Sequence, residues 1–251
     1  MVIGIDKFRE HFAGLEDQYA LIGGSACDLL FTEAGLDFRA TKDLDIVLCV
    51  EVVSANFAKA FLRFVEAGGY QARQRSDGHK EFYRFHEPRN MAYPYMIELF
   101  SRRPEGFELP ANFQITEVPV DEDVISLSAI LLDDNYYDAL RTSKIVIDGI
   151  SLLNESLLIP FKAKAFLDLT ERRAQGEKID SKTITKHRND VFRLVQLLTE
   201  ESQIKLSGSI RNDLRTFVES LRKDETINPK SFGLQLSRDE GLELIIGAYA
   251  L

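Results

Sequence analysis

Residues 41–50, TKDLDIVLCV, decide how this chain is interpreted. Asp43 and Asp45 are followed at once by apolar and β-branched residues, which predicts a buried strand over 44–50. Alternate side chains of a strand point to the same face, so both carboxylates project from one face. Like charges that close repel each other unless a cation lies between them. The stretch is therefore either a solvated strand end or a metal site.

A glycine turn precedes this stretch. YALIGG (19–24) predicts a short strand that ends at Gly23 and Gly24, and Ser25 is a suitable N-cap for a helix reaching Phe31. Glycines at such a turn let the backbone approach a ligand closely, and the N–H groups of a helix N-terminus suit a phosphate. An ordinary turn without a ligand is the alternative.

A third acid lies further along the chain. Glu98 occurs in YMIELF (95–100), a strand pattern otherwise made of apolar and aromatic residues, and a buried carboxylate needs a partner. Magnesium prefers oxygen ligands and commonly binds one or two carboxylates together with substrate phosphates. Asp43, Asp45 and Glu98, beside a turn that suits phosphate, predict a magnesium site for phosphoryl transfer.

The order of the predicted elements defines the fold class. Helices are expected at 6–18, 25–31 and 54–68, and strands at 19–24, 44–50, 79–87 and 95–101. This order predicts an α/β (α+β) fold, in which helices pack on a small mixed sheet.

The character of the chain changes after a predicted hairpin. Asp148-Gly149 between two β-type runs is a strong hairpin signal. From Pro160, which suits the first turn of a helix, the pattern is helical to the C-terminus. We expect a boundary near residue 155, with an α/β domain at 1–155 and a helical domain at 156–251.

Composition excludes some classes of protein. The chain has 251 residues, of which 45% are hydrophobic, and its net charge of −9 argues against a general nucleic-acid binder. Residues 59–103 contain nine Lys or Arg and five Asp or Glu, so this stretch is about +4 and the remainder about −13. Such a region can meet a phosphate-bearing partner, and an uneven spread of surface charge is the alternative.

The expected location is cytoplasmic. No apolar run reaches the roughly 20 residues of a membrane helix, and the first twelve residues lack the apolar core of a signal peptide. Cys27 and Cys49 lie in apolar surroundings without metal-type spacing, which is typical of reduced, buried thiols.

The motifs resemble those of a known family. GGSA (23–26) and FRATKDLDIVL (38–48) are similar to the glycine-serine and Asp-x-Asp motifs of the nucleotidyltransferase fold, the DNA polymerase beta-like superfamily. The lead-in from Arg39 through Thr41 to the aspartates most resembles the AbiEii/AbiGii-type toxins of type IV toxin–antitoxin systems. Seventeen residues separate Ser25 from Asp43, a longer spacing than the wider superfamily has, and Glu98 stands where an aspartate is common.

The helical half carries further matches. Lys164 with Asp168, and Lys186 with Asp190, have the i, i+4 spacing that puts a lysine and an aspartate on one helix face. Surface ion pairs are the alternative interpretation. Lys162 lies on an apolar stripe, and the sequence leaves open whether Lys162 or Lys164 points at the site.

The resemblance implies roles for these residues. It implies that lysines of the helical half hold the nucleotide's phosphates, that an acid positions or deprotonates the acceptor, and that the site lies in a cleft between the domains. The residues expected to bind the nucleotide are Gly23, Gly24, Ser25, Arg39, Lys162 and Lys186. Those expected to act in catalysis are Asp43, Asp45, Glu98, Lys164 and Asp190, the first three of them also as metal ligands.

The leading hypothesis is a magnesium-dependent enzyme that transfers a nucleoside monophosphate from a nucleoside triphosphate to an acceptor. By resemblance, the acceptor is a tRNA end and the protein is a toxin neutralised by a separate antitoxin. A second hypothesis keeps the chemistry with a small molecule such as an aminoglycoside, or a protein side chain, as acceptor. A third is a non-catalytic nucleotide-binding regulatory module. No membrane partner is expected.

Overall fold

The computed structural model describes residues 2–48, 54–74, 80–101, 130–131, 133–199 and 201–251. These residues divide into two compact units. The first comprises the described parts of 1–118 and 143–154, and the second those of 119–142 and 155–251. Helix α5 (Asp134–Thr142) therefore belongs to the second unit, whereas the division at residue 155 assigns it to the first. Cys27 is buried, and Cys49 lies outside the described residues.

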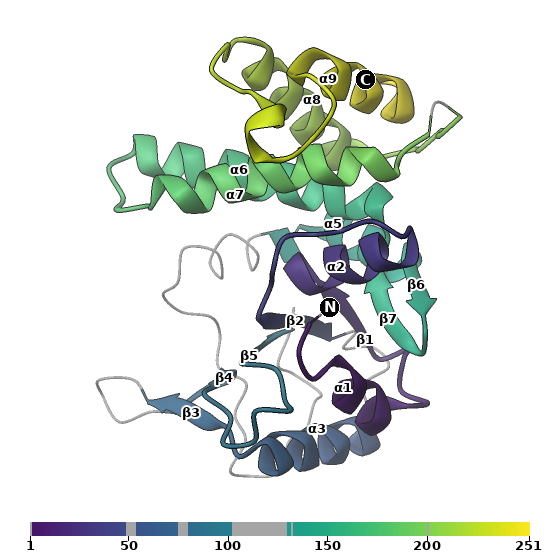
Figure 1. Ribbon diagram of the computed structural model, residues 1–251, viewed down its shortest axis with the longest axis vertical. Coiled ribbons are helices and arrows are strands. Elements are labelled where there is room, and N and C mark those ends of the chain that lie inside the picture. The colour runs from purple at the N-terminus through teal and green to yellow at the C-terminus, as the bar shows by residue number, and fades with distance from the viewer. Residues whose placement is uncertain (1, 49–53, 75–79, 102–129, 132, 200) are drawn as a thin grey trace. The chain divides into compact units, whose positions relative to one another are not determined.

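A seven-stranded mixed sheet forms the centre of the first unit (Figure 1). Its strand order is β3-β4-β5-β2-β1-β7-β6, with β1–β7 and β2–β5 parallel and the other neighbours antiparallel. The strands are β1 (Tyr19–Ile22), β2 (Asp43–Leu48), β3 (Gln71–Gln74), β4 (Lys80–His86), β5 (Met96–Ser101), β6 (Lys144–Ile147) and β7 (Ile150–Leu153). The strand with the two aspartates is therefore central, and it pairs with β1 and β5.

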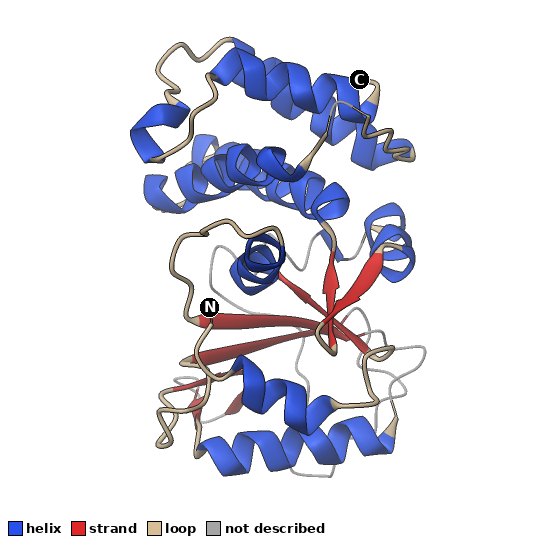
Figure 2. Cartoon of the chain, turned by 45° about the vertical axis from the view of Figure 1, so that its right-hand side comes forward, coloured by secondary structure: helices blue, strands red, loops and turns tan. Residues whose placement is uncertain are grey.

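Helices cover both faces of this sheet. Helices α1 (Ile5–Phe12) and α3 (Ala55–Gly68) lie on one face, and α2 (Gly23–Glu33) lies on the other (Figure 2). Buried aromatic rings fill the space between α1, α3 and β1; they are Phe8, Phe12, Tyr19, Phe57, Phe61 and Phe64. Helix α1 is shorter than the predicted 6–18, because the chain leaves the helix at Ala13 and turns at left-handed Gly14.

The hairpin between β6 and β7 forms as predicted. Asp148 and Gly149 have φ angles of +48° and +73°, which is the pair of left-handed residues that a two-residue type I′ turn requires. Arg9 of α1 stabilises this turn. Its Nε donates to the Asp148 carbonyl oxygen at 2.7 Å, and its Nη2 lies 2.6 Å from Asp148 Oδ2. The Asp148-Gly149 pair was therefore sufficient to predict the hairpin from the sequence.

The second unit is helical. It contains α5, α6 (Glu155–Ala174), α7 (Ser181–Leu194), α8 (Gly208–Arg222) and α9 (Arg238–Tyr249), with 3₁₀ turns at Val195–Leu197 and Pro229–Phe232. Pro160 is the sixth residue of α6, so the prediction that it lies in the first turn is wrong. Proline has no N–H to donate to the carbonyl four residues back, that of Ser156. The Tyr249 hydroxyl donates to that carbonyl at 2.9 Å, and the helix continues past the proline.

The fold class is the one that the sequence predicts. A mixed sheet with helices on its faces is followed along the chain by a largely helical unit. None of the described helices combines the length and the apolar character that crossing a membrane requires.

Candidate active site

Four residues form a row across the central strands of the sheet. Ile22 of β1 pairs with Asp45 of β2, Asp45 pairs with Glu98 of β5, and Glu98 pairs with Arg84 of β4. Register partners on adjacent strands project from the same face, so the three charged side chains are neighbours. Asp43, two positions before Asp45 on the same strand, projects from that face as well. The structure thus brings the three predicted acids to one face of the sheet.

The glycine turn lies directly against this row. A Cβ atom at Gly23 would fall 1.8 Å from Asp45 Oδ2, so the α-carbon of Gly23 packs on the carboxylate. Gly23 also has a φ of +66°, a conformation that favours glycine. A Cβ at Gly24 would lie 2.7 Å from Thr41 Oγ1 and 3.5 Å from Arg39 Nη2. The two glycines therefore admit both the aspartate and the segment that leads into it.

Ser25 has a different place from the one predicted. Helix α2 begins at Gly23 with Ile22 as the N-cap, so the prediction that Ser25 is the N-cap is wrong. The left-handed glycine turns the chain directly from β1 into the helix, two residues early. Ser25 is buried in the first turn, and its hydroxyl donates to the Ile22 carbonyl oxygen at 3.1 Å. That hydrogen bond stabilises the turn.

Arg84 is a charged partner of Glu98 that the sequence analysis missed. Both side chains are buried, and Glu98 Oε1 lies 2.7 Å from Arg84 Nε and 2.5 Å from Nη2. The signal was present, because Arg84 interrupts an aromatic strand pattern as Glu98 does. The partner that a buried carboxylate needs is therefore, in part, an arginine of the neighbouring strand.

The charge state of Glu98 reflects two opposing neighbours. Burial, and then the Asp45 carboxylate, raise the pKa of Glu98 to about 8, while Arg84 acts in the opposite direction. A hydrogen bond with Asp45 also raises this pKa, because it favours the protonated form of Glu98. The Asp45–Glu98 pair is thus a site of concentrated negative charge, which a proton or a cation relieves.

The fit of this site to magnesium follows from its donor atoms. Among the described residues, no three His, Cys, Asp or Glu side chains are grouped so that they could hold one metal ion. Glu98 is paired with Arg84. Magnesium needs only one or two protein carboxylates when phosphate oxygens and water complete its shell. Asp43 and Asp45 are two such donors and fit that mode of binding.

In the helical unit, Lys162 is part of a buried ionic cluster. Its Nζ lies 3.5 Å from Asp190 Oδ2, and Arg193 Nη1 lies 3.2 Å from Asp190 Oδ1. Asp190 is completely buried, and Lys162 is nearly so. This cluster joins α6 to α7. Lys186, which the i, i+4 spacing puts on the same face of α7 as Asp190, is exposed.

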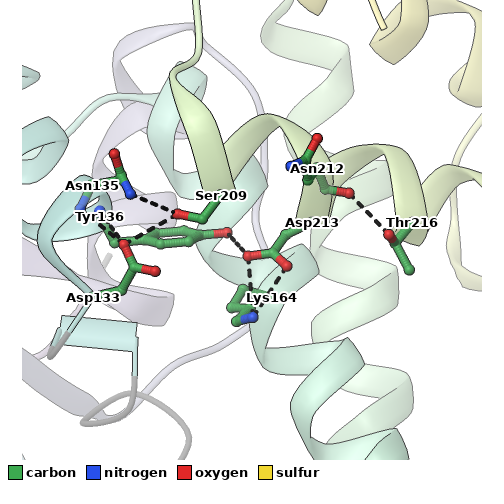
Figure 3. Close-up of polar contacts among 8 residues, drawn as sticks. All are labelled: Asp133, Asn135, Tyr136, Lys164, Ser209, Asn212, Asp213 and Thr216. Carbon is green, nitrogen blue, oxygen red and sulfur yellow. Dashed lines mark hydrogen bonds and ion pairs between the residues drawn. The ribbon is translucent and has the colours of Figure 1, made fainter.

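Lys164 lies in a second polar cluster, drawn in Figure 3. Its Nζ is 3.1 Å from both carboxylate oxygens of Asp213, and the Tyr136 hydroxyl donates to Asp213 Oδ2 at 3.1 Å. Burial, and then the Asp213 carboxylate, raise the pKa of the Tyr136 phenol, so it remains a donor. Asp168, the i+4 residue, instead lies 3.6 Å from Arg172. Helical spacing cannot predict the contact with Asp213, because this residue is 49 positions from Lys164 in the sequence.

Comparisons with known proteins give one distant structural likeness. No protein-family model matches the chain, and no curated protein matches it either. Over 96% of its length, the chain is similar to 94% of a solved structure described as an antigenic nucleotidyltransferase-like protein from Paracoccidioides brasiliensis. The TM-score is 0.47 and the sequence identity is 15%. A likeness this distant does not establish a shared activity.

Proposed function

We propose that this protein is a magnesium-dependent nucleotidyltransferase. The observation that carries the proposal is the contact between Gly23 and Asp45, where the start of α2 lies against a carboxylate of the sheet. A helix N-terminus suits a phosphate, and paired carboxylates suit the magnesium that accompanies a triphosphate. The resemblance of residues 23–26 and 38–48 to nucleotidyltransferase motifs supports the same assignment.

The triphosphate is proposed to bind at the glycine turn. The first backbone N–H groups of α2 have no partner within the helix, and they carry the positive end of its dipole. Gly24 is buried against Thr41 and Arg39, and Arg39 adds positive charge beside the turn. Ser25 contributes by holding the turn.

Asp43 and Asp45 are the proposed magnesium ligands, with Glu98 as the neighbouring acid. Magnesium bound there would neutralise phosphate charge and lower the pKa of the acceptor hydroxyl. That hydroxyl attacks the α-phosphorus, a new P–O bond forms, and the bond to the β-phosphate oxygen breaks, which releases pyrophosphate. A carboxylate of this row accepts the hydroxyl proton. Asp190 is less suited to that role, because it is fully buried between Lys162 and Arg193.

Lys164 is the proposed phosphate-binding lysine. Its side chain is 33% exposed, whereas that of Lys162 is 7% exposed and lies against Asp190. A partly exposed ammonium keeps donors for a ligand while it is paired with one carboxylate. Lys186, which is exposed, is a secondary contributor.

The proposed acceptor is a tRNA end, and the proposed biological role is that of a cytoplasmic toxin controlled by a cognate antitoxin protein. Both rest on the motif resemblance. The excess of basic residues in 59–103, about +4, is compatible with an RNA acceptor. The net charge of −9 suits a cationic drug at least as well, so acceptors of both kinds belong in the test.

The test is transfer of label from each α-labelled nucleoside triphosphate, in magnesium, to total tRNA, to aminoglycosides or to protein. Asp43→Asn and Asp45→Asn are expected to lower the transfer rate at least ~100-fold, because each removes a charged ligand. Glu66→Gln, an exposed acid on α3, is the control and leaves the rate unchanged. Equal rates in the wild type and both aspartate variants would refute the proposed site.

Calorimetry separates an enzyme from a non-catalytic binding module. The wild type is expected to bind magnesium with a nucleoside triphosphate, and the Asp43→Ala/Asp45→Ala variant to lose that binding. Binding without transfer to any acceptor favours the regulatory module. Indistinguishable binding by the two proteins removes the metal–nucleotide site from consideration.

A further inference from the structure

The ammonium group of Lys164 is held by one carboxylate, that of Asp213. Nζ lies 3.1 Å from Asp213 Oδ1 and 3.1 Å from Oδ2, so a single carboxylate on α8 engages it with both oxygens (Figure 3). A lysine side chain has a flexible four-carbon stem and many rotamers when it is free. Contact with both oxygens narrows that range. The side chain of Lys164 nevertheless remains one-third exposed, so its ammonium still has access to solvent.

Tyr136 of α5 fixes the carboxylate in turn. Its hydroxyl donates to Asp213 Oδ2 at 3.1 Å, and its ring is fully buried. The ring packs edge-on against Phe161 at a centroid distance of 5.3 Å, which restricts its rotation. Asp213 thus accepts hydrogen bonds from two side chains on two other helices, one from a rigid ring and one from a flexible lysine.

The beginning of α5 is tied to α8 by further polar contacts. Asn135 Nδ2 donates to Ser209 Oγ at 3.1 Å, and Ser209 Oγ donates to Asp133 Oδ1 at 3.2 Å. Asp133 also accepts from the backbone N–H of Asn135 at 2.8 Å. These bonds hold Tyr136 in register with Asp213. The position of Lys164 is therefore determined by three helices rather than by α6 alone.

We propose that Asp213, oriented by Tyr136, is the positioning residue for Lys164. The inference rests on the proposed function in one respect, that Lys164 binds the phosphates of the nucleotide. Asp213 keeps the ammonium in one place, and the open side of the ammonium carries the hydrogen bonds to phosphate. Asp213 itself makes no contact with the nucleotide.

A double-mutant cycle in the transfer reaction tests this role. Asp213→Asn keeps the shape and one acceptor but removes the charge, and is expected to lower kcat/KM about 10-fold, since a misplaced binding group impairs the reaction at a distance. Tyr136→Phe is expected to lower it about 3-fold, since one hydrogen bond to the carboxylate is lost. In a Lys164→Met background, neither substitution should lower kcat/KM further, because both act through Lys164. Glu219→Gln, an exposed acid on the same helix, is the charge-matched control.

The cycle distinguishes positioning from a merely structural role. If Asp213→Asn reduces kcat/KM by the same factor with and without Lys164, or leaves it unchanged in the wild-type background, the inference is wrong. Unfolding curves of each variant show whether a loss of rate reflects loss of folded protein. If Asp213 had a structural role alone, its substitution would lower the stability of the protein in both backgrounds, with no particular effect on the KM for the nucleoside triphosphate.

A second measurement does not depend on activity. Acetylation of lysines in the full chain by acetic anhydride, followed by mass spectrometry, reports how available each ammonium is. Asp213→Asn should raise the rate at Lys164 about 3-fold or more, because the amine no longer has to leave both carboxylate oxygens before it reacts. The rate at exposed Lys223 is the internal reference. No change at Lys164 overturns the inference. Absence of transfer by the wild type overturns the proposed function, while acetylation still tests the positioning role.

Discussion

Substitution of Gly23 by alanine tests the contact that defines the candidate site. Gly23 has a φ of +66°, and a Cβ there would lie 1.8 Å from Asp45 Oδ2 and 2.8 Å from its Cγ. Two effects add. The left-handed conformation is unfavourable for alanine by roughly 1–2 kcal/mol, and displacement of a packed side chain costs roughly 1–3 kcal/mol. Reduced entropy of the unfolded chain offsets roughly 0.4–1 kcal/mol. We expect Gly23→Ala to lower the free energy of unfolding by about 2–4 kcal/mol.

Gly35→Ala separates the two effects. Gly35 has a φ of +69°, almost the same as Gly23, but a Cβ there would meet nothing within 4 Å. Its substitution should therefore show the backbone effect alone, about 1 kcal/mol or less after the entropic offset. The difference between the two variants, about 1–3 kcal/mol, measures the contact with Asp45. Urea unfolding followed by circular dichroism gives both values.

Removal of the opposing carboxylate should relieve the steric part. In an Asp45→Ala background, the effect of Gly23→Ala is expected to approach that of Gly35→Ala, a coupling of about 1–3 kcal/mol. In the otherwise wild-type protein, Gly23→Ala should also lower the transfer rate about 100-fold, because it displaces Asp45 by more than 1 Å. Equal stability of Gly23→Ala and Gly35→Ala, or no coupling with Asp45, would refute the close approach of the turn to the carboxylate.

Two further predictions concern buried polar groups, and a third concerns a buried ion. The pKa of Glu98 is about 8 in the folded state, above its ordinary value of 4.5. Between these pH values the folded protein holds a proton that the unfolded chain releases, so its stability falls as the pH rises. In urea unfolding from pH 6 to 9, the wild type should lose about 2–3 kcal/mol of stability relative to Glu98→Gln, and parallel pH profiles of the two proteins would contradict this. Tyr249→Phe removes the hydroxyl that donates to the Ser156 carbonyl oxygen, and should lower the free energy of unfolding, measured by calorimetry, by about 1–2 kcal/mol. An unchanged free energy of unfolding would show that another group donates to that carbonyl. Asp190→Ala leaves the buried Lys162 and the partly buried Arg193 without the Asp190 carboxylate, and should lower the free energy of unfolding by roughly 3–5 kcal/mol. Glu243→Gln, in an exposed ion pair, should cost less than about 1 kcal/mol, and similar values for the two variants would mean that Asp190 is solvated.

The elements with a local cause were predictable from the sequence. Asp148-Gly149 specifies its own turn, because both residues tolerate positive φ. Ser54, which caps α3 by accepting from the Phe57 N–H, and left-handed Gly69, which ends it, are likewise local signals. The alternation of Asp43 and Asp45 within a strand predicted correctly that both project from one face.

Where the local signal failed, a distant residue or a steric detail was responsible. Pro160 is tolerated in the middle of α6 because Tyr249, almost ninety positions away, donates to the carbonyl that a proline cannot serve. Helix α2 begins at Gly23 because that glycine accepts a left-handed turn against Asp45. Neither cause is visible in a window of neighbouring residues.

The sequence by itself determined the chemistry available at the candidate site: two aspartates on one strand face, a third acid in an apolar strand, and a glycine turn before a helix. These depend on residue type and on periodicities of two or 3.6, which are properties of the local backbone. Only the tertiary structure decided the partners. Arg84 reaches Glu98 through strand pairing, and Asp213 reaches Lys164 through the packing of α6 and α8. Charges find partners in space, across strands and helices whose pairing the spacing of residues along the chain does not specify.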